Sequence, residues 1–200
     1  MTAPDAHDWP FYCEENIWYR CSSAPGLLES ARVIFVSNAR RSVAVWHQRA
    51  AASPSVPVVW DYHVILVAPE AGAWQVYDPD SSLDVPTNAL AYLEACFPAL
   101  PPGQAHLRPR FRVLPARVYR EELRSDRRHM QGPDGSWLKP PPPRPCIGHG
   151  SNLARFIDTE TAFLGEVLDL EALRARLRES PPDSEPPATT GGRPRPPALS

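Results

Sequence analysis

The chain lacks the features that mark several large protein classes. It has 200 residues, a formal net charge of -2 and no dense Lys/Arg stripe, so a nucleic-acid partner has little support. Its best apolar stretch, 56–69, is interrupted by Asp61 and His63 and does not resemble a transmembrane segment. The first eight residues have neither the basic start nor the apolar run of a secretory signal. These absences predict a soluble, intracellular protein in the cytoplasm, with the nucleus as an open alternative.

Paired cysteine motifs and internal repeats are absent too. The four cysteines are scattered without a C-x-x-C pair, which argues against a zinc ribbon or a redox dithiol. Without a secretory signal, free thiols are expected rather than a disulfide framework. We expect three of these thiols to be buried by packing: Cys21, Cys96 and Cys146.

Proline, by contrast, is abundant. The chain has 26 prolines, about 13% of its residues against roughly 5% in average proteins. The run 140–145 favours an extended polyproline conformation within a long loop, 125–150. Beyond Pro181 there is almost nothing to bury, so we predict a single domain, 1–179, and a disordered tail, 180–200. A ligand for an SH3-type domain is the functional alternative for this tail.

Hydrophobic periodicity predicts a mixture of helices and strands. A helix is expected from Cys13 to Cys21, and a hairpin from Arg32–Val36 and Ser42–Trp46. A long strand, Val56–Val67, is expected to form a second hairpin with Trp74–Tyr77. The remaining expected elements are helices at Thr87–Cys96, Ala116–Leu123 and Leu168–Leu177 and a strand at Arg110–Leu114.

Three residues in this arrangement have the types and order of a nucleophilic triad. Cys13 opens a helix, His63 lies in a strand, and Asp78 ends the next strand across a hairpin. A helix N-terminus beside an imidazolium lowers the pKa of a thiol, and an aspartate fixes the histidine tautomer. Each residue also has an ordinary interpretation: a packing thiol, a satisfied core histidine, and a turn-forming aspartate. Spacing alone leaves both interpretations open.

Seven strings in order are more specific. Together they resemble the protein N-terminal glutamine amidohydrolase family, and the resemblance runs from about residue 12 to the last expected helix. The strings are YCEENIW (Tyr12–Trp18), FVSN (Phe35–Asn38), VWDYHV (Val59–Val64), YDPD (Tyr77–Asp80), FRV (Phe111–Val113), SDRRHM (Ser125–Met130) and PPPPRPCI (Pro140–Ile147).

The resemblance implies an α+β, papain-like fold, an α-β-α sandwich with a mainly antiparallel sheet. It implies a monomeric cysteine amidohydrolase with Cys13 as nucleophile, His63 as base and Asp78, rather than Asp80, as the residue that orients the histidine. Such enzymes convert glutamine at the first position of a protein to glutamate, which an arginyl-transferase uses in the Arg/N-degron pathway. No metal or organic cofactor is implied. The backbone N–H of Cys13 is a candidate oxyanion donor.

Substrate-binding residues are less defined. An acid near the site is the natural partner of the substrate's α-amino cation, and Glu15 and Asp61 are our candidates; a helix-dipole charge and a strand-surface charge are the alternatives. Trp60 is expected to wall the site or to fill the core. Asn38 is expected to line the cleft or to form a turn.

The charged loop residues have two interpretations as well. Asp126, Arg127 and His129 either form a surface salt bridge, which we favour, or shape the pocket. Other functions are also open for the whole chain: a transglutaminase-like or protease-like acyl transferase uses the same triad, and a catalytically silent binding module keeps only the fold.

Overall fold

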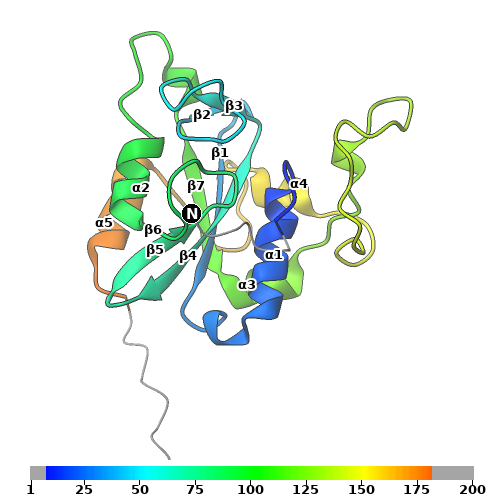
Figure 1. The fold of residues 1–200 in the computed structure, drawn as a ribbon, viewed down its shortest axis with the longest axis horizontal. Helices are drawn as coiled ribbons and strands as arrows, with labels where there is room; N and C mark the ends of the chain where they lie inside the picture. The colour runs from blue at the N-terminus through cyan, green and yellow to red at the C-terminus, as the bar shows by residue number, and fades with distance from the viewer. Residues whose placement is uncertain (1–7, 182–200) are drawn as a thin grey trace, which may run out of the picture.

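The computed structural model describes residues 8–181. Residues 1–7 and 182–200, which include nearly all of the predicted tail, lie outside the described residues. Figure 1 shows the elements in space. In chain order they are α1 (Cys13–Ser23), β1 (Arg32–Ser37), β2 (Val43–Val45), β3 (Val58–Trp60), β4 (His63–Glu70), β5 (Ala73–Tyr77), β6 (Thr87–Asn88), α2 (Ala89–Cys96), β7 (Arg110–Pro115), α3 (Ala116–Glu122), α4 (Leu153–Ile157), β8 (Glu166–Leu168) and α5 (Leu170–Arg178), with short 3-10 turns at Pro25–Leu27, Ala105–Leu107 and Arg128–Met130.

A six-stranded sheet forms the centre of the fold. Its strand order is β6-β5-β4-β1-β7-β8, and every neighbouring pair is antiparallel. β1 lies in the middle, so that Ile34 is opposite Ile65 of β4 on one side and Val113 of β7 on the other. β2 and β3 form a separate two-stranded sheet. The predicted α+β class with a mainly antiparallel sheet is confirmed.

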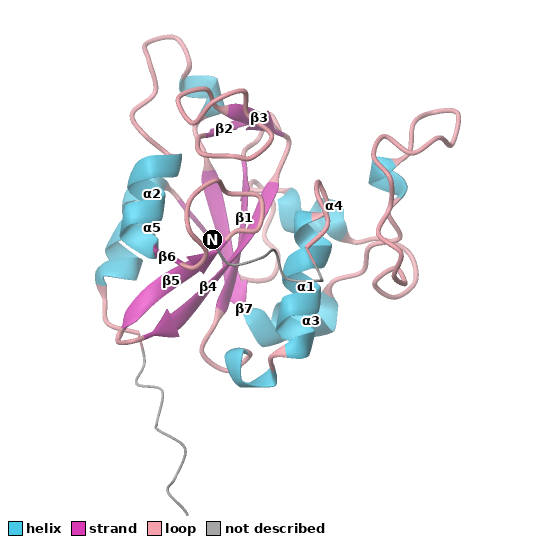
Figure 2. Ribbon diagram, in the orientation of Figure 1, coloured by secondary structure: helices cyan, strands magenta, loops and turns pink. Residues whose placement is uncertain are grey.

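Helices cover both faces of the main sheet (Figure 2). Because strand side chains alternate, Phe35 and Val64 point into one core and Ile34 and Ile65 into the other. The first core is closed by α1, α3 and α4, and the second by α2 and α5. Fully burying one such side chain contributes about 1.5–3 kcal/mol. The three-layer order is compatible with the papain-like arrangement.

The predicted hairpin between Arg32–Val36 and Ser42–Trp46 is wrong. β1 pairs with β4 and β7, whereas β2 pairs with β3. Asn38 is the physical reason: its Oδ1 accepts from the backbone N–H of Arg40 and Ser42, and its Nδ2 donates to carbonyls of Ser42, His106 and Arg108. This side chain turns the backbone out of the sheet.

The predicted strand Val56–Val67 is two strands. The backbone breaks at Asp61 and Tyr62, between β3 and β4. The Ser37 hydroxyl donates to the Asp61 carbonyl, and the Asp61 carboxylate accepts from the N–H of Tyr62, so both residues bond outside a strand ladder. The break makes His63 the first residue of β4, at the end of the sheet rather than within a long strand.

The other predicted elements are confirmed within a few residues. β4 and β5 form the expected hairpin, and positive φ at Ala71 and Gly72 suits a two-residue turn. α2 begins after Asn88, because the Asn88 side chain accepts from the N–H of Leu90 and Ala91 and caps the helix. The sequence did not predict α4, β6 or β8. Among the helices of residues 8–181, none has the length and apolar character needed to cross a membrane.

Candidate active site

Cys13 lies in the first turn of α1, where the helix packs against β4. Its side chain is 7% exposed and belongs to the core that includes Val64. The backbone N–H of Val64, the residue after His63, acts on the sulfur and favours its charged form. The packing of α1 on the sheet therefore brings the cysteine to the strand end that carries the histidine.

His63 forms a buried pair with Asp78. Imidazole Nε2 lies 2.9 Å from Asp78 Oδ1, and each side chain is 1% exposed. Burial lowers the pKa of His63, but the charge and hydrogen bond of Asp78 outweigh it, so the pKa is raised above its usual value. The Trp60 ring stacks on the imidazole, with centroids 6.0 Å apart and planes 15° from parallel.

Asp78 has further donors beyond the histidine. Oδ2 accepts from the Tyr92 hydroxyl at 2.7 Å and from Gln48 Nε2 at 3.2 Å, and Oδ1 accepts from the N–H of Asp80 at 3.1 Å. Burial raises the pKa of Asp78, yet the charge and hydrogen bond of His63, with the bonds from Tyr92 and Gln48, bring it below its usual value. Sequence reasoning missed Gln48 and Tyr92, which no motif marks.

Asp80 lies close to this pair. Potential ligand atoms of His63, Asp78 and Asp80 lie within 4.8 Å of one another, so these are residues of the described chain that could hold a metal ion. His63 Nε2 and both Asp78 oxygens already have protein partners. Burial is the main cause that raises the pKa of Asp80 to about 6. Asp78, and not Asp80, forms the hydrogen bond to His63.

The Cys13 thiol is not the low-pKa thiol that its position predicts. Burial, followed by the negative charges of Glu14 and Asp80, raises its pKa well above the usual value. The sulfur lies 4.0 Å from Glu14 Oε2, and among residues 8–181 it has no hydrogen bond to the His63 ring. The expected lowering by the helix N-terminus and an imidazolium is outweighed by desolvation and by a neighbouring carboxylate.

Glu14 is that carboxylate, and sequence reasoning did not select it. Its side chain is 0% exposed, and Oε2 accepts from the Tyr62 hydroxyl at 3.0 Å. Oε1 lies 3.3 Å from His129 Nε2, within ion-pair distance. Within the described residues, neither Oε1 of Glu14 nor Nδ1 of His129 has a hydrogen-bond partner, although both atoms are buried. The contact joins α1 to a loop 115 positions further along the chain, so no local pattern indicated it.

Glu15, a predicted substrate-binding residue, has a different environment. Its two carboxylate oxygens accept from Arg127 Nε at 2.6 Å and Nη2 at 2.8 Å, and Arg144 Nε lies 3.5 Å away. The Glu15 and Arg127 side chains are 0% and 7% exposed, so this bond is a buried bidentate pair rather than the surface salt bridge we favoured for the loop. Asp126 instead pairs with Arg128 at the surface.

The loop 125–150 lies against α1 through backbone carbonyls. The hydroxyls of Tyr12 and Tyr19 donate to the carbonyls of Lys139 and Pro145, at 3.1 and 3.0 Å. Arg127 also donates to the Pro142 carbonyl at 3.2 Å. The proline-rich segment is therefore held beside the helix that carries Cys13.

The other candidate substrate-binding residues, Trp60, Asp61 and Asn38, have different environments. Trp60 walls His63, as described, and its ring also contacts Phe11, with centroids 6.1 Å apart. The Asp61 side chain is exposed and caps the N–H of Tyr62. Asn38 forms the turn described above, the alternative we had left open. No measured contact tests a substrate role for these residues or for Glu15, so those predictions stay predictions.

The other three thiols differ in their exposure to solvent. All four cysteines are free, as expected. Cys21 and Cys96 are fully buried, but Cys146 is exposed, so its predicted burial is wrong. Cys146 follows Pro145 in the loop 125–150 and belongs to neither of the two cores.

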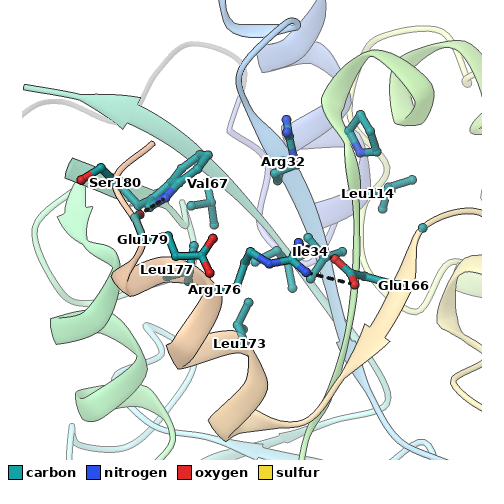
Figure 3. Close-up of a pocket in the computed structure, with 14 residues that line it drawn as sticks. Arg32, Ile34, Val67, Leu114, Glu166, Leu173, Arg176, Leu177, Glu179 and Ser180 are labelled. Atoms are coloured by element: carbon teal, nitrogen blue, oxygen red, sulfur yellow. Dashed lines mark hydrogen bonds and ion pairs between the residues drawn. The ribbon is translucent and has the colours of Figure 1, made fainter. Parts of the chain in front are cut away.

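A pocket of about 430 Å³ (Figure 3) lies beside the core closed by α2 and α5, whereas Cys13 belongs to the other core. Ile34, Val67 and Leu173 form part of its wall, and these residues belong to the core closed by α2 and α5. Two of its lining residues, Arg176 and Glu166, form an ion pair at 2.7 Å (Figure 3). It contains none of the triad residues.

The chain is similar to proteins of one known family. Residues 9–177 match the family model described as N-terminal glutamine amidase. The chain belongs to this family. Proteins named protein N-terminal glutamine amidohydrolase from Drosophila melanogaster, Drosophila mojavensis and Drosophila virilis are each 41% identical to it over 151 residues, which cover 71% of this chain and 72% of each relative. The family resemblance carried by the seven strings is confirmed.

Proposed function

We propose that this protein is an amidohydrolase that converts N-terminal glutamine of proteins and peptides to glutamate and releases ammonia. Membership of the N-terminal glutamine amidase family supports the substrate. The observation that carries the chemistry is the buried pair of His63 and Asp78, 2.9 Å apart, at the strand end against which the Cys13 helix packs.

Cys13 acts as nucleophile and His63 transfers protons in the proposed reaction. Because Nε2 of His63 bonds Asp78, Nδ1 is the nitrogen that we assign to the Cys13 thiol. His63 takes the thiol proton, and the sulfur attacks the side-chain carboxamide carbon of glutamine. The backbone N–H of Cys13 donates to the oxyanion. His63 then returns the proton to the leaving nitrogen, the C–N bond breaks, and ammonia and a thioester result.

Hydrolysis completes the cycle. His63 takes a proton from water, and the hydroxide oxygen attacks the thioester carbon. The C–S bond then breaks, His63 returns the proton to the sulfur, and glutamate and the Cys13 thiol result. The pKa of Asp78 is below its usual value, so its carboxylate stays charged and supports the imidazolium in both half-reactions. No step requires a metal or an organic cofactor.

The expected place of the reaction follows from its product. An N-terminal glutamate is the substrate of an arginyl-transferase, so we propose that the protein acts as a monomer ahead of that enzyme in the Arg/N-degron pathway. We also propose the cytoplasm, with the nucleus as an alternative, as its location.

Peptides with glutamine first, asparagine first, or glutamine in the interior test the proposal. We expect ammonia release only from the peptide with glutamine first. Its mass should rise by about one dalton, because the side-chain NH2 is replaced by OH. Cys13→Ala is expected to lower the rate at least about 10³-fold, and Cys146→Ala, an exposed thiol, is the matched control. Release from interior glutamine, or peptide-bond cleavage, would support the transglutaminase-like or protease-like alternative. Unchanged release by Cys13→Ala would overturn the mechanism.

A further inference from the structure

Glu14 presents a buried charge that its protein surroundings leave half paired. Oε2 accepts from Tyr62, but Oε1 is buried and has no hydrogen bond within residues 8–181. Burying a carboxylate without full pairing is costly, and a bound ligand group or an ordered water can supply the missing partner. The Nδ1 atom of His129, on the other side of the same contact, is likewise buried and unpaired.

We propose that Glu14 binds the α-ammonium group of the substrate through Oε1, an assignment that rests on the proposed function. The ammonium group supplies the donor that this oxygen lacks. His129 and Tyr62 lie around the same carboxylate, within 3.3 Å of Glu14, and line the place where the cation sits. Recognition of the free amine then comes from a residue adjacent to the nucleophile.

The dimensions of glutamine agree with this placement. Its α-nitrogen is four bonds from its carboxamide carbon, at most about 5 Å away by standard bond lengths. The Cys13 sulfur lies 4.0 Å from Glu14 Oε2. A substrate whose carboxamide carbon contacts the sulfur therefore places its ammonium group within reach of the Glu14 carboxylate.

The other nearby acids fit this role less well. Both oxygens of Glu15 bond Arg127, so a second cation there would meet a guanidinium group. Asp61 is exposed, and its carboxylate caps a backbone N–H. Asp80 lies beside His63 and Asp78, on the side of the site that holds the base. Glu14 combines burial, closeness to the sulfur and an oxygen that has no hydrogen bond within residues 8–181.

The assignment also links recognition to reactivity. The charge of Glu14 is the largest electrostatic cause, after burial, of the raised pKa of the Cys13 thiol. A bound ammonium group neutralises that charge, so it makes the thiolate easier to form. A peptide without a free amine should therefore suffer in kcat as well as in KM.

The test compares two substrates that differ only in the amine. One is the tripeptide Gln-Gly-Trp, and the other is its des-amino analogue, in which a 4-carbamoylbutanoyl group replaces glutamine. Ammonia release gives kcat/KM for each. The wild-type protein is expected to favour the tripeptide at least about 30-fold, and Glu14→Gln is expected to bring the ratio close to one. Glu94→Gln, on the exposed side of α2, is the matched control and should keep the wild-type ratio.

The outcomes separate the two proposals. If the wild-type protein acts on the tripeptide and Glu14→Gln keeps the same ratio, the Glu14 assignment is wrong and the proposed function stands. If the wild-type protein releases no ammonia from either substrate, the proposed function fails, and the assignment fails with it.

A measurement on the wild-type protein covers the case in which Glu14→Gln does not fold. Norvalyl-glycine and pentanoyl-glycine, which have no side-chain carboxamide to hydrolyse, are compared as competitive inhibitors of ammonia release at about pH 6.5, below the ordinary pKa of an α-amino group. At that pH only norvalyl-glycine carries an ammonium group. We expect it to inhibit at least about 30-fold more strongly than pentanoyl-glycine. Equal inhibition by the two probes would contradict the assignment.

Discussion

The two halves of the site differ in how completely their polar atoms are paired. On the histidine side, the Asp78 carboxylate accepts from His63, Tyr92, Gln48 and the N–H of Asp80. On the cysteine side, Glu14 has a buried oxygen without a hydrogen bond in the described chain, beside a thiol of raised pKa. The base is thus held before substrate arrives, whereas the nucleophile lies where a substrate group can still be added.

Asp78→Asn should have the largest effect of these variants on kcat, because it disrupts the histidine side of the site, where the polar atoms are fully paired. An amide can present the wrong hydrogen-bonding group to Nε2 of His63 and cannot support the imidazolium by charge. We expect kcat to fall about 10³- to 10⁴-fold, as for the orienting aspartate of Ser-His-Asp triads. Steady-state ammonia release measures this loss, and Asp80→Asn serves as the control. A larger loss in Asp80→Asn than in Asp78→Asn would reverse the assignment of the two acids.

Glu15→Gln should lower the free energy of unfolding more than the same change at the adjacent Glu14. It leaves the Arg127 guanidinium buried without its carboxylate, which typically costs about 3–5 kcal/mol in the free energy of unfolding. Glu14→Gln, which removes a charge with no guanidinium partner in the described residues, should cost less. Denaturant titration compares both variants, with the exposed Glu94→Gln within about 0.5 kcal/mol of wild type. Similar losses in both would show that the two carboxylates are equally paired.

Asp80→Asn tests the raised pKa of Asp80, which lies on the histidine side of the site. A folded-state pKa of about 6, against 3.8 for the ordinary carboxyl, means that the folded state holds the proton more tightly. Stability should therefore fall as pH rises from about 4 to about 6, and the loss above that range is at most about 3 kcal/mol. The variant should be more stable than wild type at pH 7 and show less change across that interval in thermal unfolding. A variant less stable at pH 7 would contradict the raised pKa.

Tyr92→Phe should have the smallest effect. It removes one of the donors to Asp78, a hydrogen bond to a charged group worth about 1.5–3 kcal/mol when buried. Tyr77→Phe removes a similar bond, 2.8 Å to Glu70, but at the surface, and should cost under about 1 kcal/mol. Chemical denaturation of the two variants gives the comparison directly. Equal costs would mean that burial adds nothing to the hydrogen bond of Tyr92.

Elements with a local signal were predictable. The acidic first turn of α1, the Gly72 turn of the β4–β5 hairpin and the periodicity of α2 all lie within one short segment. The partners of β1 were not predictable, because the side-chain bonds of Asn38 reach carbonyls of His106 and Arg108, about 70 positions away. The break before His63 also depends on a distant donor, Ser37.

The same division holds for the site. Cys13, His63 and Asp78 were selected by residue type, order and family strings, and the structure joins the last two by a hydrogen bond. Glu14 and Glu15 are adjacent and look alike in the sequence, yet one meets His129 and the other Arg127. The loop that brings these partners starts more than 100 positions later, so packing alone decides which glutamate is neutralised.

The proline run 140–145 has a consequence for the cost of ordering this site. Prolines restrict the unfolded chain, so a segment rich in them loses less conformational entropy when it is fixed. Its carbonyls at Pro142 and Pro145 still accept hydrogen bonds from Arg127 and Tyr19, which hold it on α1. The proline run therefore needs no helix or strand to stiffen it. The loop 125–150 that contains the run also keeps His129 beside Glu14.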